Sequence, residues 1–299
     1  MGVSDIDTGE RKPLVLDIAA LKTGGLIKEK GKELFAIRMR VPVGKMSAGH
    51  LIEIARVAVK YGSGNLHFTV RQGIEIQDVP FARLQEARDE LEAAGLRIGA
   101  CGPRFRVVTA CPGVGVCPNG LVSAQELGSA LDERFFGKEE GLDLPHKFKV
   151  AVAGCTSCCP KPQENDLGFH GQVEPQLFSD ECTSCGVCEV TCKEGAISMD
   201  ENDLPVRDLS KCIFCGDCIK SCPVDAWRVR RTGLAAYVGG RFGRHPRLGS
   251  KVIDFLTIAE AEGLVSKTLA FYKEFGKKGE RLGVAVERLG LDFYKEKVL

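Results

Sequence analysis

Long apolar segments are missing from this sequence of 299 residues. A helix that spans a bilayer needs roughly 18 or more consecutive apolar residues, and no such run occurs, so we expect no membrane span. Residues 1–13 are polar and of mixed charge, and they lack the apolar stretch of a signal peptide. Both absences lead us to expect a cytoplasmic protein.

An excess of charge of one sign is also missing. The 41 Lys and Arg residues against 40 Asp and Glu residues leave a formal net charge of +1. This balance argues against a protein that binds nucleic acid through bulk positive charge. No nicotinamide or flavin fingerprint is apparent. The length and the hydrophobic fraction of 44% allow two domains, or one large domain with an insertion.

Cysteine is missing from the first 100 residues and abundant after them. All 14 cysteines lie between positions 101 and 222, and eight of them fall within the 41 residues from Cys182 to Cys222. Disulfides are rare in the cytoplasm, so metal clusters are the better explanation for this number. The change in density indicates a small module inside a larger chain.

The dense stretch contains the spacing C-x2-C-x2-C-x3-C twice. This spacing is typical of bacterial ferredoxins, in which the fourth cysteine of each run binds the other cluster. The crossed assignment gives one [4Fe-4S] cluster on Cys182, Cys185, Cys188 and Cys222, and a second on Cys192, Cys212, Cys215 and Cys218. Two zinc sites are the alternative, although zinc sites rarely use three cysteines that are each separated by two residues.

Two further cysteine pairs lie outside this stretch, on loops rich in glycine and proline. Cys111 and Cys117 form C-x5-C, and Cys155 and Cys159 form C-x3-C. Two such pairs can close a third cluster, although scattered structural cysteines or a zinc site could look similar. We interpret the unassigned Cys101 and Cys158 as small buried apolar side chains.

Basic residues recur two or four positions apart in three segments that read as strands, so that they project from one face. These are His67 and Arg71 within 66–72, Arg104 and Arg106 within 104–107, and Lys147 and Lys149 within 147–152. The last two segments lead directly to cysteine pairs. Solvated strand faces are the alternative. An anionic substrate or cofactor in a dry pocket, or the anionic cluster itself, would require the same arrangement.

Taken together, these residues resemble the siroheme-containing sulfite and nitrite reductase family. The resemblance rests on Thr-Val-Arg-Gln at 69–72, on C-x5-C followed by C-x3-C, and on Lys-Phe-Lys at 147–149 just before the second pair. It runs from about Gly25 to the end of the chain. An inserted ferredoxin domain is similar to the dissimilatory and anaerobic sulfite reductase branch.

The resemblance implies siroheme and three [4Fe-4S] clusters as cofactors. The siroheme-coupled cluster would be held by Cys111, Cys117, Cys155 and Cys159, with the Cys159 thiolate bridging to the siroheme iron as its axial ligand. The residues that match the family's anion-binding set are Arg71, Arg106, Lys147 and Lys149. Candidates for contacts with the siroheme carboxylates are His67, Thr69, Gln72, Arg104, Arg241, Arg244 and Arg247. An exposed basic loop is the alternative for the last three.

Two positions depart from the family's pattern. Ser157 stands where Asn is usual, and Cys158 stands where a small or polar residue is usual. Both lie beside the bridging cysteine, so they leave open how the electronic properties of the cluster are set and which substrate is used.

The activity that the resemblance implies is the multi-electron reduction of sulfite to sulfide. Electrons would come from reduced ferredoxin or another donor protein and would enter through the inserted module. Nitrite reduction and an electron-transfer subunit without its own reductase activity are the alternatives. Family members often carry two units of this kind, so a chain with one unit predicts a homodimer or pairing with a related subunit.

The fold class that follows is α+β. A ferredoxin-like half-domain is expected over 1–100, and a siroheme/[4Fe-4S] α/β domain over 101–178 and 229–299. The bacterial-type 2[4Fe-4S] ferredoxin module would be inserted at 179–228. Within the half-domain, alternation predicts a strand over 34–42 and a strand or hairpin over 65–79 with Gly73 at its middle, and helical spacing predicts helices over 47–60 and 80–94. Residues from Ser250 onward read as largely helical.

Overall fold

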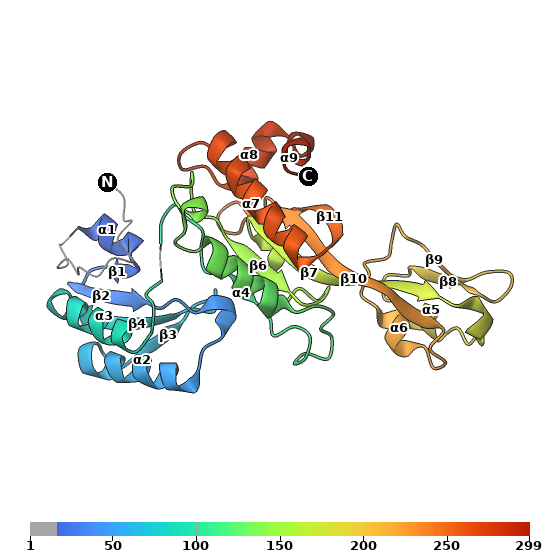
Figure 1. Ribbon diagram of the computed structural model, residues 1–299, viewed down its shortest axis with the longest axis horizontal. Coiled ribbons are helices and arrows are strands. Elements are labelled where there is room, and N and C mark those ends of the chain that lie inside the picture. The colour runs from blue at the N-terminus through green and yellow to red at the C-terminus, as the bar shows by residue number, and fades with distance from the viewer. Residues whose placement is uncertain (1–16, 100) are drawn as a thin grey trace. The chain divides into compact units, whose positions relative to one another are not determined.

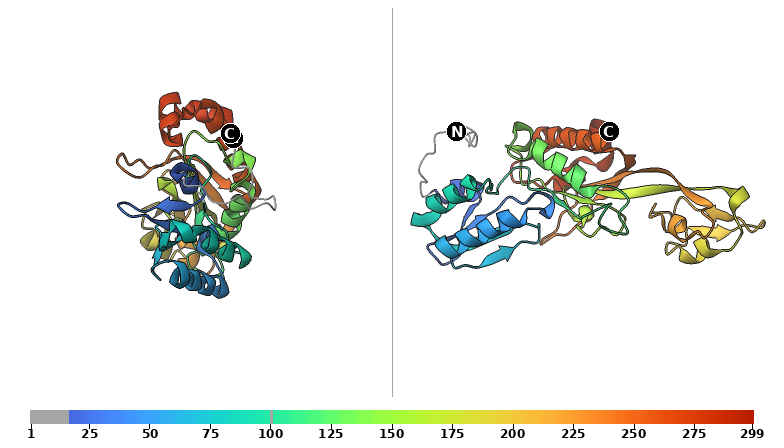
Figure 2. Two further views of the ribbon diagram at one scale, coloured as in Figure 1. Left: turned by 90° about the vertical axis from the view of Figure 1, so that its left-hand side faces the viewer. Right: turned by 60° about the horizontal axis from the view of Figure 1, so that its bottom comes forward.

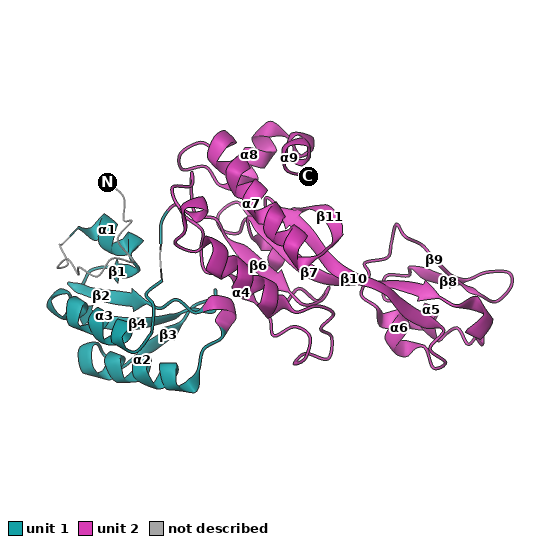
Figure 3. Ribbon diagram, in the orientation of Figure 1, with its two compact units in different colours: residues 1–41, 45–102 teal, residues 42–44, 103–299 magenta. Residues whose placement is uncertain are grey.

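The computed structural model describes residues 17–99 and 101–299, and it divides into two compact units (Figure 3). Unit 1 comprises the described residues up to Val41 together with Lys45–Gly102, and unit 2 comprises Pro42–Gly44 with Pro103–Leu299. The segment 1–13, on which the expectation of no signal peptide rests, lies outside the described residues. Within the described ranges, no helix combines the length and the apolarity needed to cross a bilayer.

Unit 1 is a four-stranded antiparallel sheet with helices. The strand order is β1-β2-β4-β3, with β1 at Leu26–Lys28, β2 at Leu34–Arg38, β3 at Leu66–Phe68 and β4 at Ile74–Pro80 (Figure 1). The helices are α1 Ile18–Thr23, α2 Ala48–Tyr61 and α3 Leu84–Ala93. Alternating apolar residues of the strands and one face of α2 and α3 form its core.

The ends of these helices follow the sequence signals. The Ser47 hydroxyl accepts a hydrogen bond from the backbone N–H of His50 at 3.1 Å, and Gly62 stands at the C-cap of α2. Helix α3 begins four residues after Pro80 because Phe81–Arg83 form a 3-10 turn first. The predicted helix over 80–94 is therefore confirmed with a later start.

The strand predicted over residues 66–72 is too long. β3 ends at Phe68, and the chain then turns: the N–H of Gly73 donates to the hydroxyl of Thr69 at 3.0 Å, and Gln72 adopts a φ of 58°. Phe68 is 65% exposed and Val70 is 103% exposed. β3 lies at the edge of the sheet and pairs only with β4, so the alternation of apolar residues does not mark a buried face here.

Unit 2 is built on a mixed five-stranded sheet in the order β11-β10-β7-β6-β5. The strands are β5 Thr109–Ala110, β6 Val150–Ala153, β7 Leu167–Leu177, β10 Trp227–Val238 and β11 Ser250–Leu256. β5, β6 and β7 are parallel, whereas β7, β10 and β11 are antiparallel. The helices are α4 Ala124–Phe135, α7 Ile258–Phe275, α8 Leu282–Leu289 and α9 Leu291–Val298. The predicted helical C-terminal region thus starts at Ile258, after a strand.

The segment between β7 and β10 carries eight cysteines. The two strands pair from Leu167 with Val238 to Leu177 with Trp227, and Figure 2 shows this ribbon running into the segment. The segment contains α5 Val187–Thr191, β8 Ile197–Met199, β9 Pro205–Arg207 and α6 Asp217–Ser221. Its own buried apolar cluster consists of Cys188, Ile197, Cys218 and Trp227. Two cysteines thus occupy half of a very small core.

A buried ion pair ties the start of β7 to helix α8. Asp166 is fully buried, and Arg281 donates to its carboxylate from Nε at 3.0 Å and from Nη2 at 2.7 Å. The backbone N–H of Lys149 donates to the same carboxylate at 2.9 Å. Burial raises the pKa of Asp166, and the adjacent Arg281 opposes that rise.

The independence of the unit 2 core from the segment at 178–226 can be tested by excision. Replacing residues 178–226 with Asn-Gly would connect β7 to β10 through a two-residue hairpin. The main core of unit 2 contains none of the excised residues, so we expect the variant to keep cooperative thermal unfolding, followed by circular dichroism. An insoluble or non-cooperative product would show that this core needs the segment.

Breaking the buried ion pair is expected to be costly. Arg281→Leu leaves the Asp166 carboxylate buried without its partner, and such a change costs about 3–5 kcal/mol of unfolding free energy. Arg241→Ala removes a more exposed arginine–glutamate pair and should cost about 1 kcal/mol or less. Urea unfolding of both variants gives the comparison, and equal losses would contradict it.

Candidate functional site

Four basic residues gather beside one backbone bridge in unit 2. Phe105 pairs with Phe148 in parallel, through bonds from Arg106 N–H to Phe148 O at 2.9 Å and from Phe148 N–H to Arg104 O at 3.0 Å. Both phenyl rings are fully buried and lie 5.8 Å apart. Because side chains alternate, the flanking residues project to the other face. They are Arg104, Arg106, Lys147 and Lys149, all half-buried.

Of the strand predicted over 104–107 only this bridge forms, whereas the strand predicted over 147–152 forms from Val150 onward. Regular β structure begins only at Thr109 and at Val150, where β5 and β6 pair in parallel. The predicted alternation of basic and apolar residues nevertheless holds, since Phe105, Phe148, Val150 and Val152 are buried.

His146 reports on the electrostatics of this region. Burial lowers its pKa, and the positive charges of Lys147, Arg281 and Arg106 lower it further, whereas the Asp166 carboxylate opposes them. These cations therefore lie close enough to one another to act on the same imidazole. The region is suited to an anion.

The two cysteine pairs outside the dense segment lie at the carboxyl ends of β5 and β6. The N–H of Cys111 donates to Val152 O at 3.2 Å, and the N–H of Gly154 donates to the Cys111 sulfur at 3.0 Å. A Cβ on Gly154 would lie 2.7 Å from the Cα of Gly113, so only glycine permits this approach of the two loops. Cys111 and Cys117 are half-buried, Cys155 is buried, and Cys159 is exposed.

Cys158 lies among these cysteines in a strained backbone conformation. Its φ is 53°, and the side-chain amide of Gln163 donates to its sulfur at 3.1 Å. Burial raises the pKa of the Cys158 thiol, and nearby Cys155, Cys159 and Cys111 raise it further. The structure therefore brings three of the four predicted ligands near one point. Cys158 is half-buried and hydrogen-bonded, rather than the fully buried apolar side chain that the sequence led us to expect.

Glycines on the neighbouring strands make room for the loop that carries Cys155 and Cys159. A Cβ on Gly171 would lie 2.3 Å from Gly154 O, and one on Gly168 would lie 2.1 Å from Pro162 O. The loop therefore packs directly on the backbone of β7. Close contacts between the two backbones therefore position the cysteines, and no large side chain lies between them at these glycines.

The predicted residues of unit 1 occupy the edge of its sheet. His67 lies on β3, whereas Thr69, Arg71 and Gln72 lie in the turn that follows. His67 is exposed, and the other three are half-buried. They share one local surface within unit 1.

The basic residues of the loop between β10 and β11 have acidic partners of their own. Arg241 lies 2.8 Å and Arg247 lies 3.1 Å from carboxylate oxygens of Glu287, and the two arginines pair in an antiparallel bridge. Arg244 is exposed. Arg241 and Arg247 therefore share one acidic partner, and their contact with the siroheme carboxylates stays a prediction.

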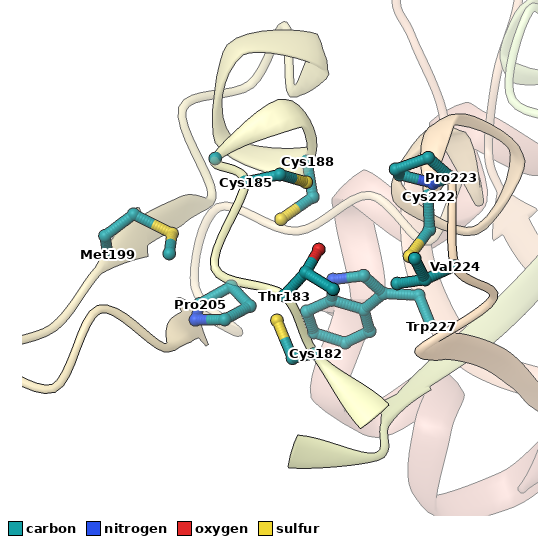
Figure 4. A pocket seen from close by; sticks show the side chains of 11 residues that line it. Cys182, Thr183, Cys185, Cys188, Met199, Pro205, Cys222, Pro223, Val224 and Trp227 are labelled. Atoms are coloured by element: carbon teal, nitrogen blue, oxygen red, sulfur yellow. The ribbon is translucent and has the colours of Figure 1, made fainter. Parts of the chain in front are cut away.

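The eight cysteines of residues 182–222 line two separate pockets. The first pocket is lined by Cys182, Cys185, Cys188 and Cys222 (Figure 4). The second pocket is lined by Cys192, Cys212, Cys215 and Cys218. Each pocket thus takes its fourth cysteine from the other run, in the crossed pattern that the spacing predicts.

The two runs share one backbone, displaced by 30 positions. Left-handed residues recur at matching places, as Ser184 with Phe214, Gly186 with Gly216, and Gly195 with Asp225. The short helices α5 and α6 match in the same way, at Val187–Thr191 and Asp217–Ser221. This segment is therefore an internal duplication in structure as well as in sequence.

Three of the eight thiols in these pockets have a raised pKa, whereas backbone hydrogen bonds lower the pKa of Cys222. Burial raises the pKa of Cys188 and of Cys215, and it raises the pKa of Cys218 to about 12. Thiolates are the ligands of iron–sulfur clusters, so bound iron would have to supply the stabilisation that burial removes. Across residues 17–99 and 101–299, no three Cys, His, Asp or Glu side chains converge closely enough to hold a single metal ion.

Several residues of these sites give no signal in the sequence. Asp166 and Arg281 are 115 positions apart, and only the fold joins them to the Lys149 segment. Lys220, on α6, approaches Pro118 O and Asn119 Oδ1 at 3.5 Å, directly after Cys117. Trp227 and Arg207 line the two cysteine pockets. As the one tryptophan of the chain, five residues after Cys222, Trp227 could have been noticed.

Comparisons with known proteins agree with this arrangement. Residues 101–299 match the family described as "Nitrite and sulphite reductase 4Fe-4S domain". Residues 27–94 match the "Nitrite/Sulfite reductase ferredoxin-like half domain". The ferredoxin-like half-domain predicted from the sequence is thereby confirmed.

Individual relatives carry related names. The chain is 32% identical to the coenzyme F420-dependent sulfite reductase of Methanocaldococcus jannaschii over 92% of this chain, but it spans only 44% of that relative. It is 28% identical to a subunit of the anaerobic sulfite reductase of Salmonella typhimurium, over 92% of this chain and 85% of the relative.

A solved structure shares the fold. The crystal structure of dissimilatory sulfite reductase I matches with a TM-score of 0.73 and 20% identity, over 89% of this chain and 69% of that one. With both parts of the chain matched, siroheme and an iron–sulfur cluster follow as cofactors at the level of the family, and the chain belongs to the nitrite and sulphite reductase family as an oxidoreductase.

Proposed function

We propose that this chain reduces sulfite to sulfide, with siroheme and three [4Fe-4S] clusters as its cofactors. The observation that carries the proposal is the bridge between Phe105 and Phe148, which sets four cations on one face just ahead of two cysteine loops. Relatives named sulfite reductase support sulfite as the substrate. Nitrite is the alternative substrate, because it needs the same cations.

The cysteine loops fit the siroheme-coupled cluster. Cys111, Cys117, Cys155 and Cys159 would hold it, and the exposed Cys159 would also bind the siroheme iron. Gly113 and Gly154 let the two loops approach, and the N–H of Gly154 donates to a ligand sulfur. Siroheme supplies the site for sulfur–oxygen bond cleavage when it is bound, and the cluster supplies electrons.

The cations would bind and orient the anion. Arg106, Lys147 and Lys149 would neutralise the sulfite oxygens, and Arg71 remains a candidate for the same role. As each oxygen leaves as water, the lysine ammonium groups can donate protons to it. Charges fixed by the Phe105–Phe148 bridge and by the Asp166 carboxylate need no reorganisation during turnover. Arg104, Arg244, His67, Thr69 and Gln72 remain candidates for contacts with siroheme carboxylates.

The segment at residues 179–228 would act as a ferredoxin module through which electrons enter. Its two cysteine pockets fit two clusters, and Lys220 links it to the loop that follows Cys117. Reduced ferredoxin or another donor protein would supply the electrons. Since some relatives are named as subunits, we propose that the chain works as a homodimer or with a related subunit.

Removal of one cation tests the substrate site. Arg106→Ala should lower sulfite reduction about 10²–10³-fold, because one fixed charge no longer stabilises the developing anion. The siroheme absorption band should stay. Arg134→Ala, which removes a surface arginine on α4, is the matched control and should leave turnover unchanged. Wild-type turnover in Arg106→Ala would remove that residue from the site.

The cofactor content can be counted directly. Anaerobically purified protein should contain about twelve irons in clusters and about one in a tetrapyrrole per chain, with matching acid-labile sulfide. Cys215→Ser should lower the cluster iron selectively, because Cys215 lines only the second pocket, and should leave the tetrapyrrole spectrum intact. Stoichiometric zinc in place of iron, or clusters without any tetrapyrrole band, would contradict the proposal.

A further inference from the structure

The duplicated backbone allows the two cysteine pockets to be compared position by position. A shift of 30 residues carries Cys182 onto Cys212, Gly186 onto Gly216, and Ile197 onto Trp227. Ile197 lines the second pocket, and Trp227 lines the first. At the same place in the repeat, one pocket therefore has an aliphatic side chain and the other has an indole with an N–H donor.

The indole N–H of Trp227 is buried without a well-formed hydrogen bond. Trp227 is only 5% exposed, and its Nε1 has no acceptor in hydrogen-bond geometry among the described residues. Figure 4 shows the nitrogen edge of the ring turned toward the cavity that the sulfurs of Cys182, Cys188 and Cys222 surround. Buried tryptophan N–H groups usually have an acceptor, so this donor indicates an acceptor that occupies the pocket.

The two pockets also differ in their place along the β7–β10 ribbon. Trp227 pairs with Leu177 at the end of the ribbon, so the first pocket lies there. The second pocket lies nearer to the five-stranded sheet than the first pocket does. A Cβ on Gly216 would lie 2.5 Å from Val173 Cγ1, and the N–H of Val173 donates to Phe214 O at 3.0 Å. The Phe214 ring meets Phe255 of β11 edge to face, with centroids 4.9 Å apart.

We propose that Trp227 donates its indole N–H to a sulfur of the cluster in the first pocket and thereby raises the reduction potential of that cluster alone. This inference rests on the proposed function, since it requires a cluster in that pocket. The first pocket, at the far end of the ribbon, would then hold the cluster that accepts the electron from the donor protein. The second pocket would pass it toward the sheet.

The physical reason is charge. When the cluster gains one electron from the donor, its sulfurs become more negative, and a hydrogen bond to sulfur stabilises the reduced form more than the oxidised form. A buried donor acts strongly, because little water competes with it. The second pocket has an aliphatic side chain at the matching position, Ile197, and a donor of a different kind, the buried Nη1 of Arg207, which also has no acceptor among the described residues.

Redox titration of the holoprotein, followed by electron paramagnetic resonance, tests this inference. Trp227→Phe keeps an aromatic ring and removes the donor, and we expect one of the three cluster midpoints to become more negative while the other two stay. Ile197→Leu changes the matching position without changing any donor and should shift none. Unshifted midpoints in Trp227→Phe, or an equal shift of all three, would overturn the inference.

A second variant separates the loss of the N–H donor from any loss of packing around the ring. Because the chain has a single tryptophan, biosynthetic replacement by the benzothiophene analogue of tryptophan puts sulfur in place of the N–H at this position alone. It should reproduce the shift of Trp227→Phe with unchanged iron content, and an unshifted midpoint here would again overturn the inference. Protein without clusters in either pocket would contradict the proposed function itself, whereas intact clusters with unshifted midpoints would contradict the inference alone.

Discussion

The parallel alignment of residues 104–111 with residues 147–155 is the constraint on which the rest of unit 2 depends. The bridge from Phe105 to Phe148 and the pairing of β5 with β6 hold the two segments in one register. Parallel strands bring their carboxyl ends to the same edge of a sheet. The register therefore sets basic side chains on one face and delivers Cys111 and Cys155 to adjacent positions beyond it. The Asp166–Arg281 pair secures the same register through the backbone of Lys149.

The cysteine-rich segment follows a different principle. Its buried apolar cluster has four members, two of them cysteines, which is too little to stabilise a fold of this size by burial alone. The duplicated turns and helices instead create two pockets whose walls are thiols. Cofactor binding and folding would then be coupled in this segment, whereas the large core of unit 2 contains none of its residues.

Sequence patterns predicted the features that depend on spacing. Crossed cysteine pockets follow from two identical runs, and helix ends at Ser47 and Gly62 follow from capping chemistry. Patterns failed where neighbours in space decide the outcome. The apolar residues Phe68 and Val70 do not pack because β3 is an edge strand, and the alternation at 104–107 gives one bridge instead of a strand. Contacts such as Asp166 with Arg281 join distant positions and leave no local signal.

The central claim is that Cys159 connects an iron–sulfur cluster to a macrocyclic iron within reach of the cations. Anomalous diffraction at the iron edge, on crystals of the anaerobically purified protein, measures this directly. The account predicts two iron centres in contact with the Cys159 sulfur, one a cluster shared with Cys111, Cys117 and Cys155 and the other the iron of a tetrapyrrole ring. A Cys159 sulfur distant from any tetrapyrrole iron, or bonded to zinc, would contradict it.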